Sequence, residues 1–260
     1  MAVNHDIPPA DKHGEPKKNH RRRSSGFSGP ITFLIVIVSV IFVMSVLFRV
    51  SDISVEGNEH YTDSEIIQAI DIEEGDNLFF FDRFSMVSRV FAKLPYIEQV
   101  SVERSLPNKV IISVVESKAL AYLELGDEHW TLDHNCKVLG KAAEGELSFL
   151  IPVEGIKPGT LLIGEPMQTA DNNEELVAYL AEVLTQIQDR GLQYSVTRID
   201  FSNTKRVEFG YAGKYTVILG GQSNIEYKFG MFLSAAGKLL EGDVGIIDVS
   251  DGVKAHFSPN

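Results

Sequence analysis

The stretch that decides the fold is Arg104–Leu123, which reads RSLPNKVIISVVESKALAYL. From Val110 to Val114 apolar residues recur at every second position, the pattern of a half-buried β-strand. The residues before Pro107-Asn108 alternate in the same way. Proline presets φ for the second position of a tight turn and asparagine tolerates the third. The stretch therefore predicts a β-hairpin, whose role depends on its surroundings.

A short strand and two helices are expected upstream of this hairpin. The segment VSDISVE, residues 50–56, alternates like a strand and is followed by the turn pair Gly57-Asn58. Thr62 and Glu65 match a capping box that opens a helix. A second helix is expected to bury an apolar face that recurs every three or four residues until Pro95: Phe84, Val87, Val90, Phe91 and Leu94. The predicted order is β-α-α-β-β.

An apolar run precedes this unit. Residues 31–48 read ITFLIVIVSVIFVMSVLF and contain no charge. At about 1.5 Å rise per residue the run spans roughly 27 Å, close to the thickness of a bilayer's hydrocarbon core. The alternative is a cleaved secretory signal, which is shorter and ends in small residues, whereas this run ends in Leu47-Phe48-Arg49. We therefore predict a transmembrane helix over residues 31–50.

Charge on the two sides of the run predicts its orientation. The preceding tail, residues 1–30, carries six basic and three acidic residues, and its composition predicts disorder. The remaining residues include 18 basic and 33 acidic ones. Because basic flanks stay in the cytoplasm, the ectodomain is expected outside the cell, and its acidity argues against nucleic acid as a partner. The residues expected to set this topology are Lys17, Lys18, Arg21, Arg22 and Arg23.

The order β-α-α-β-β, with the hairpin last, resembles the POTRA module. Three segments add to this: VEGN at residues 55–58, the stretch from Pro95 to Val102, and ERSLPNKVIISVVESKALAYL from Glu103. With a membrane span just upstream, the sequence resembles the FtsQ/DivIB family of bacterial cell-division proteins. The most distinctive motif comprises Arg104, Pro107, Asn108, Ile112, Val114 and Glu116, followed by Ala119. Its individual residues are expected to act structurally, through turn chemistry and strand alternation.

The resemblance also sets the expected fold class and domain organisation. We expect an α+β protein with a disordered tail at 1–30, a transmembrane helix at 31–50 and a POTRA domain at 51–118. A second mixed α/β domain of the FtsQ/DivIB type, with a mainly antiparallel sheet, is expected at 119–260. Its first helix is expected to open with a capping box at Asp171–Glu174 and to end at Gly191, and Asn224 is expected to cap a second helix.

The C-terminal stretch predicts a hairpin at the edge of that sheet. Asp251-Gly252 lies between two strand-like runs, so residues 253–257 are expected to fold back on residues 245–249. Exposed edge strands bind other strands by β-augmentation. In the resembled family the last strand is where a small coiled-coil division protein docks. The resemblance implies this role for Gly252, Val253, Lys254, Ala255, His256 and Phe257.

No pattern of catalytic chemistry stands out. The best candidate for a metal or catalytic site is the group His129, Asp133, His134 and Cys136, but its spacing fits no common zinc motif, and Asp-His-Asn is typical turn chemistry. No nucleotide, P-loop, nucleophile-elbow or HExxH motif appears. We therefore expect no enzyme, no cofactor, no metal and no small-molecule substrate, although an acid/base pair among the many carboxylates stays an alternative.

Three functions are compatible with these features. The resemblance implies a single-pass scaffold of the division septum, which binds small bitopic coiled-coil proteins (FtsB/DivIC-like and FtsL-like) and regulates septal peptidoglycan synthesis. A second is an export or envelope-assembly factor, since POTRA modules also serve there. Such proteins usually carry repeated POTRA units before a membrane barrel, which this pattern lacks. The third is a hydrolase or transferase that acts on the cell wall. The first is our prediction.

Overall fold

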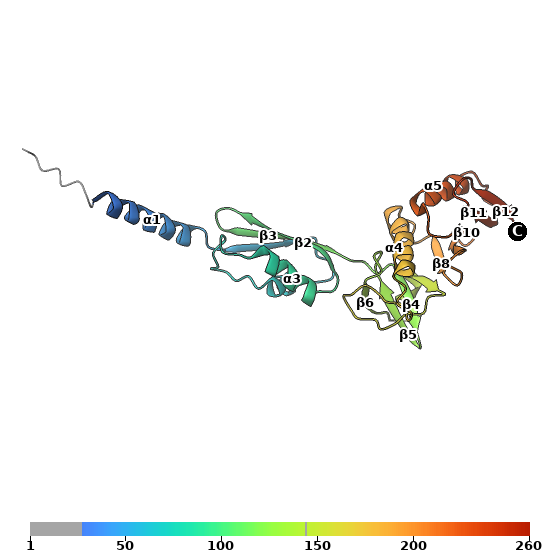
Figure 1. Ribbon diagram of the computed structural model, residues 1–260, viewed down its shortest axis with the longest axis horizontal. Coiled ribbons are helices and arrows are strands. Elements are labelled where there is room, and N and C mark those ends of the chain that lie inside the picture. The colour runs from blue at the N-terminus through green and yellow to red at the C-terminus, as the bar shows by residue number, and fades with distance from the viewer. Residues whose placement is uncertain (1–27, 144) are drawn as a thin grey trace, which may run out of the picture. The chain divides into compact units, whose positions relative to one another are not determined.

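The structure, a computed structural model, describes residues 28–143 and 145–260. The five basic residues that are expected to set the topology lie outside this range. Two compact units are present, one ending at Leu47 and the other running from Phe48 to Asn260. The described part of the first unit is the helix α1, Ser28–Leu47. Figure 1 shows α1 and the elements of the second unit.

Helix α1 is long and apolar enough to cross a membrane. It has 20 residues, which at about 1.5 Å per residue extend roughly 30 Å. Residues Gly29–Leu47 have a mean hydropathy of 2.8, and none of them is buried within the structure. It is the one helix of this kind in the described residues. The helix begins and ends about three residues before the expected bounds.

The first part of the second unit has the predicted β-α-α-β-β order. Its sheet has the strand order β1-β3-β2, in which β1 runs parallel and β2 antiparallel to β3. The side chains of Ile66, Ile70 and Val90 from the two helices are fully buried together with Val110 and Ile112 of the sheet. The elements are β1 (Asp52–Glu56), α2 (Asp63–Ile70), α3 (Arg83–Lys93), β2 (Ile97–Ser105) and β3 (Lys109–Glu116).

The local signals of this part were confirmed at the start of α2 and failed in α3. Thr62 and Glu65 form the predicted capping box. In α3, by contrast, Phe84 is 82 % exposed and Phe91 45 % exposed, so the expected apolar face is wrong at both. The helix buries Met86 and Val90, one turn apart, because its axis is rotated so that this stripe faces the sheet.

The hairpin turn that opened the sequence argument has one residue more than expected. Ser105 pairs with Lys109, so Leu106, Pro107 and Asn108 form a three-residue loop rather than a two-residue turn. The Leu106–Pro107 peptide bond is cis.

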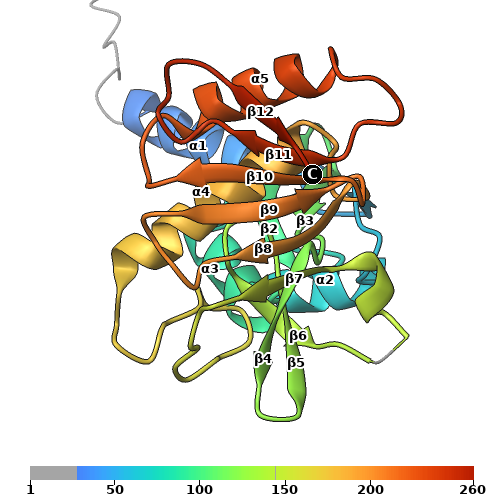
Figure 2. The ribbon, with the colours of Figure 1, turned by 90° about the vertical axis from the view of Figure 1, so that its right-hand side faces the viewer.

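The second part contains a nine-stranded sheet in the order β12-β11-β10-β9-β8-β7-β4-β5-β6. Five of its pairings are antiparallel and three are parallel, so the sheet is mainly antiparallel as predicted. Figure 2 shows strands β8 to β12 following one another across the sheet, with β12 outermost. The strands are β4 (Ala121–Leu125), β5 (Glu128–Leu132), β6 (Val138–Lys141), β7 (Ile151–Glu154), β8 (Val196–Asp200), β9 (Val207–Tyr211), β10 (Tyr215–Gly220), β11 (Gly245–Asp248) and β12 (His256–Pro259).

Two α-helices, α4 (Glu174–Asp189) and α5 (Ile225–Ala236), pack on this sheet, and a 3-10 turn, Leu147–Phe149, precedes β7. The N-cap of α4 is Asn173, whose side chain accepts a hydrogen bond from the Leu176 backbone N–H. The capping box expected from Asp171 is therefore wrong by two residues. Asn224 stands at the N-cap of α5 as predicted, but its side chain makes no capping bond. Helix α5 buries Phe229 and Phe232 against Phe209 of β9, and it also contacts β10 and β11.

Candidate protein-binding edge

The C-terminal strand β12 forms one edge of the nine-stranded sheet. It pairs antiparallel with β11, with Ile247 opposite Phe257 and Ile246 opposite Ser258. On its other side no strand of the described residues pairs with it. The backbone groups on that side are therefore available to another strand.

The backbone hydrogen bonds define which groups point outward. The Asn260 N–H donates to the Val244 carbonyl, at 3.0 Å, and the Gly245 N–H donates away from β12, to the Lys214 carbonyl next to β10. Bonding and non-bonding pairs alternate in an antiparallel ladder, so Ser258 and His256 bond to β11. Phe257 consequently turns its N–H and carbonyl to the free side. Pro259 has the same orientation, so the N–H that proline lacks would not have bonded to β11.

The strand begins later than the sequence predicted. Residues 253–257 were expected to pair with β11, but β12 starts at His256, and Gly252 to Ala255 form the connection before it. The reason is a longer turn: the Gly252 N–H donates to the Val249 carbonyl, and Gly252 has a φ of +64°. The pairing partner, β11, lies where it was expected.

Asp251 organises this connection. Its Oδ1 accepts hydrogen bonds from the backbone N–H of Val253, at 2.8 Å, and of Lys254, at 3.1 Å. These two bonds hold the pKa of Asp251 below its usual range, because they stabilise the charged carboxylate. His256 Nε2 lies 3.9 Å from the other carboxylate oxygen. One side chain therefore fixes the approach of the chain to β12.

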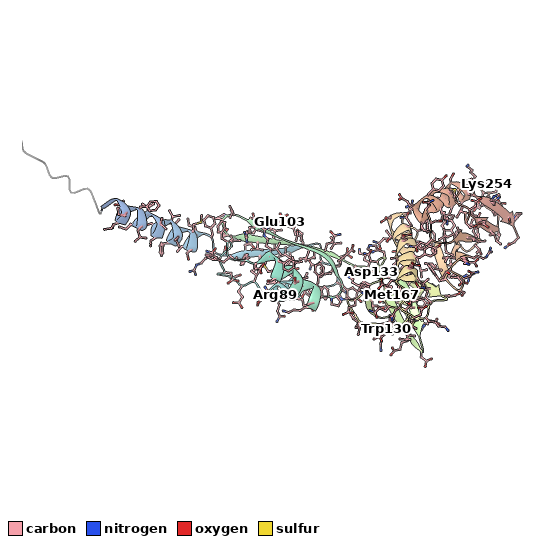
Figure 3. All side chains as sticks on the ribbon, in the orientation of Figure 1. Arg89, Glu103, Trp130, Asp133, Met167 and Lys254 are labelled. Carbon is pink, nitrogen blue, oxygen red and sulfur yellow. The ribbon has the colours of Figure 1, made fainter. Side chains whose placement is uncertain are left out.

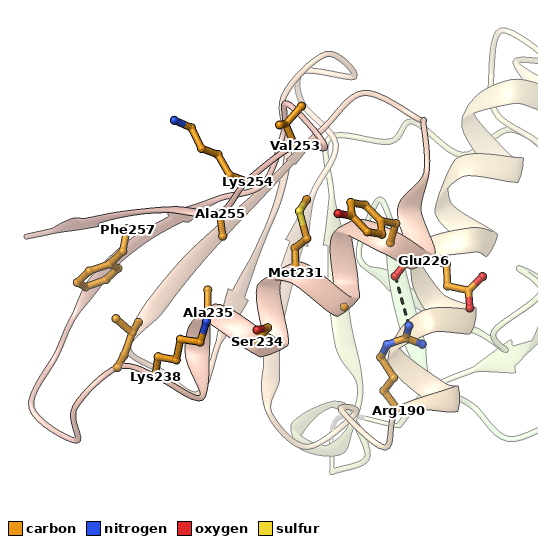
Figure 4. A pocket seen from close by; sticks show the side chains of 13 residues that line it. Arg190, Glu226, Met231, Ser234, Ala235, Lys238, Val253, Lys254, Ala255 and Phe257 are labelled. Atoms are coloured by element: carbon orange, nitrogen blue, oxygen red, sulfur yellow. Dashed lines mark hydrogen bonds between the residues drawn. The ribbon is translucent and has the colours of Figure 1, made fainter.

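Helix α5, the residues that follow it and residues 253–257 line a groove of about 940 Å³, which we call the C-terminal groove. Ala255 and Phe257 point toward α5 in Figure 4, whereas Lys254 points away from the helix. Lys254 also projects from the molecule in the wider view of Figure 3. The lining residues are Arg190, Glu226, Tyr227, Gly230, Met231, Ser234, Ala235, Lys238, Leu239, Val253, Lys254, Ala255 and Phe257.

The chemistry of the C-terminal groove is apolar with a basic rim. Three of its charged residues are basic (Arg190, Lys238 and Lys254) and one, Glu226, is acidic. The chain as a whole has a formal charge of −12. Val253, at the mouth, is 75 % exposed. Such a groove is suited to a partner segment that carries apolar side chains next to acidic ones.

Sequence reasoning missed the contribution of α5 to this site. Tyr227, Met231 and Ala235 recur every four residues and form a second apolar stripe, beside the buried one that contains Phe229 and Phe232. A helix with two apolar stripes has more apolar surface than one sheet face can cover. This excess of apolar surface on α5 is a signal in the sequence for a groove on the side of the helix that faces away from the sheet.

The residues of the family motif lie in the POTRA part, where three of them make hydrogen bonds. Arg104 donates to the Phe81 carbonyl at 3.2 Å, and the side-chain amide of Asn108 donates to the Ser51 hydroxyl. Pro107 is in the hairpin loop. Glu116 is 9 % exposed and accepts backbone hydrogen bonds from residues 59–61. These residues are not part of the C-terminal edge.

The candidate metal group does not converge. Asp133 Oδ1 accepts from the backbone N–H of Asn135 and Lys137, which is the predicted turn chemistry. His134 lies 3.8 Å from Glu98, and Cys136 is buried, with its thiol nearest the Val177 carbonyl. His129 faces Glu124 on a neighbouring strand. Across residues 28–143 and 145–260, no three such side chains gather in a way that could hold a metal ion.

Comparison with known proteins agrees with the resemblance. A family model described as "POTRA domain, FtsQ-type" matches residues 48–117, the segment that holds β1 to β3. The cell division protein DivIB of Clostridium botulinum (strain Hall) is 26 % identical over 235 residues, which cover 90 % of each chain. Residues 48–117 thus match a POTRA domain of the FtsQ type, and the chain is similar to FtsQ/DivIB proteins over most of its length.

Two further FtsQ/DivIB proteins match shorter stretches. DivIB of Bacillus subtilis (strain 168) is 32 % identical over 123 residues, 47 % of this chain and 46 % of its own. The cell division protein FtsQ of Corynebacterium glutamicum is 24 % identical over 105 residues, 40 % of this chain and 47 % of its own. The names of these relatives support a role for this chain in cell division. Together with α1 they fit a single-pass membrane protein of the septum.

Proposed function

We propose that this chain is a non-enzymatic scaffold of the division complex, which binds an FtsB/DivIC-like protein by strand addition to β12. The ectodomain also binds an FtsL-like protein, and the assembly regulates septal peptidoglycan synthesis. Helix α1 anchors the chain, with the basic tail in the cytoplasm and residues 51–260 outside, as a POTRA domain to residue 118 and a second domain beyond it. The observation that carries the proposal is the free edge of β12 directly above the C-terminal groove.

The edge and the groove together suit one extended partner. A strand that adds to β12 can bond to the N–H and carbonyl of Phe257, and every second side chain of that strand points to the α5 side of the sheet. There it reaches the groove that Ala255 and Phe257 share with α5. The basic rim favours a partner segment that carries acidic residues beside its apolar ones.

The binding test compares two variants of one residue in the full chain. Phe257→Pro and Phe257→Ala both remove the ring, which packs edge-on against Tyr215, but only Phe257→Pro also removes the outward N–H. Titration of an FtsB/DivIC-like protein onto membrane-reconstituted chain should give a Kd about fivefold weaker for Phe257→Pro than for Phe257→Ala, the equivalent of about 1 kcal/mol for one backbone hydrogen bond. Equal affinities would remove strand addition at β12 from the proposal.

Two further measurements address the rest of the proposal. Protease added to intact cells should digest residues 51–260, because basic flanks keep the tail inside. Protection of the ectodomain would reverse the orientation. Incubation of the purified chain with peptidoglycan should give no product, and turnover that survives further purification would replace the scaffold by an enzyme.

A further inference from the structure

The segment before α3 and the first turn of α3 expose phenylalanines that the fold of the POTRA part does not need. Phe80 is 85 % exposed and Phe84 is 82 % exposed, while Phe79 is 44 % exposed. Leu78, between them and the core, is completely buried and anchors the segment. Exposed phenyl rings in water forgo the free energy that burial of an apolar side chain provides. Something outside the described structure is expected to cover them.

The backbone holds these rings outward in defined turns. The Phe79 N–H donates to Asn77 Oδ1 at 3.0 Å, and the Phe80 N–H donates to the Asn77 carbonyl at 3.1 Å. Asp82, the N-cap of α3, accepts from the Phe84 N–H at 3.1 Å. Each ring is thus attached to a backbone segment that already has its hydrogen bonds. Their exposure is a property of these turns.

One of these rings, that of Phe79, lies beside the first residue after α1. The Leu78 N–H donates to the Phe48 carbonyl at 2.9 Å, and the rings of Phe48 and Phe79 meet edge-to-face with centroids 5.0 Å apart. Phe48 follows Leu47, the last residue of α1, through one peptide bond, so their Cα atoms are about 3.8 Å apart. We call Phe48, Phe79, Phe80 and Phe84 the aromatic patch. The peptide bond between Leu47 and Phe48 keeps the aromatic patch close to the end of α1 in the chain.

The β2–β3 loop extends the apolar character of this end. The Ser51 N–H donates to the Asn108 carbonyl, so the loop lies where β1 begins, as Figure 1 also shows. Leu106, in that loop, is 61 % exposed. Charges around it are mixed: Lys109 pairs with Asp52 at 3.1 Å. The end is therefore apolar without a dominant charge of one sign.

We propose that the aromatic patch inserts into the interfacial layer of the membrane that α1 crosses, with Phe80 and Phe84 among the lipid headgroups and upper acyl chains. The proposal rests on the membrane anchoring stated under the proposed function. Continuity with α1 supports lipid as the occupant, because the patch cannot leave the bilayer surface by more than a short length of chain. Mixed charge means that zwitterionic lipid is sufficient. Such contact holds the POTRA part against the bilayer at a second point.

The test uses the full chain in nanodiscs of phosphatidylcholine, without partner proteins. The single native cysteine, Cys136, is completely buried and does not compete for label, so Phe80→Cys and Phe84→Cys can each carry one nitroxide. Tyr194→Cys, at a side chain 81 % exposed in the second part of the unit, is the matched control. Spin-label relaxation then compares access of oxygen, which concentrates in lipid, with access of a water-soluble nickel chelate.

Labels at 80 and 84 should lose access to the nickel chelate and gain access to oxygen, relative to the label at 194. If either is as accessible to nickel as the control, the proposal is overturned, and a protein partner becomes the occupant of the patch. Alkaline carbonate washing of membranes separates the two levels of failure. If the chain stays in the washed membranes but its labels at 80 and 84 are accessible to nickel, the lipid contact alone is refuted. If the wash extracts the chain from the membranes, the membrane anchor and the lipid contact are refuted together.

Discussion

The Glu116 carboxylate accepts a hydrogen bond of 3.0 Å from the backbone N–H of Tyr61, although 55 residues separate the two. Glu116 also accepts from the N–H groups of Glu59 and His60. Three successive N–H groups that converge on one anion form a backbone nest. The last residue of β3 is thereby tied to the loop between β1 and α2, which closes the POTRA part around its sheet.

Replacement of Glu116 by alanine should destabilise the protein by about 2 kcal/mol. The side chain is 9 % exposed, so its removal leaves three backbone donors with reduced access to water, and hydrogen bonds to a charged group are worth about 1.5–3 kcal/mol net. Urea unfolding of the full chain in detergent, followed by circular dichroism, measures the loss. Lys118→Ala is the matched control, because its ion pair with Glu59 at 2.9 Å is exposed on both sides. A similar loss in the free energy of unfolding in both variants would contradict a stabilising role for the Glu116 hydrogen bonds.

Sequence reasoning succeeded where the signal was local and the surrounding fold agreed with it. Thr62 and Glu65 predicted the start of α2 because both partners of a capping box lie within one turn. The order of strands and helices in the POTRA part followed from alternation and helical spacing. The motif around Arg104 and Glu116 predicted the family, although the hydrogen bonds of these residues could be seen only in the structure.

Where the sequence misled, its residues were compatible with more than one arrangement. Phe84 has the spacing of a buried position, yet the stripe through Met86 and Val90 faces the sheet, and helical spacing alone does not say which of two stripes is chosen. The Asp251-Gly252 pair predicted a two-residue hairpin, but Asp251 instead caps two N–H groups of the following residues. That local bond delays the strand to His256. Neither choice is encoded by the residue types alone.

Cys136 should be inert to alkylation in the folded protein. Burial raises the pKa of its thiol, and Asp133 nearby adds to the shift, so the reactive thiolate is scarce well above neutral pH. Iodoacetamide at pH 8 should therefore modify the chain only after urea unfolds it, as measured by mass spectrometry. Rapid modification of the native chain would show that this core opens.

Asp251→Ala should release the connection before β12. The variant loses both bonds to the Val253 and Lys254 N–H groups, so these amides should exchange with solvent faster. Asp251→Asn is the matched control, because its amide oxygen can still accept them. Hydrogen-exchange protection factors, read by mass spectrometry, compare the two variants. Equal protection in all three chains would remove this role from Asp251.

Acid should weaken the same connection in the unmodified chain. Because the pKa of Asp251 is lowered in the folded state, its stabilising effect is complete above the ordinary aspartate pKa and is lost as pH falls through the lowered value. Protection at residues 253 and 254 should therefore fall in strong acid in the unmodified chain and change less in Asp251→Asn. An equal acid response in both would assign the effect to other carboxylates.

Gly245→Ala should displace β12 from the sheet. A Cβ at residue 245 would clash with the Ser258 carbonyl oxygen, which belongs to the backbone of β12 and can move only if the strand shifts. Forced overpacking of this kind typically costs about 1–3 kcal/mol, and protection of the β12 amides should fall with it. Gly242→Ala, where nothing lies within 4 Å of the added carbon, should change the free energy of unfolding by less than about 0.5 kcal/mol.

If strand addition at β12 is the binding mode, Gly245→Ala should also lose affinity for an FtsB/DivIC-like protein while Gly242→Ala keeps it. Loss of protection at β12 with full affinity would place the partner elsewhere on the chain.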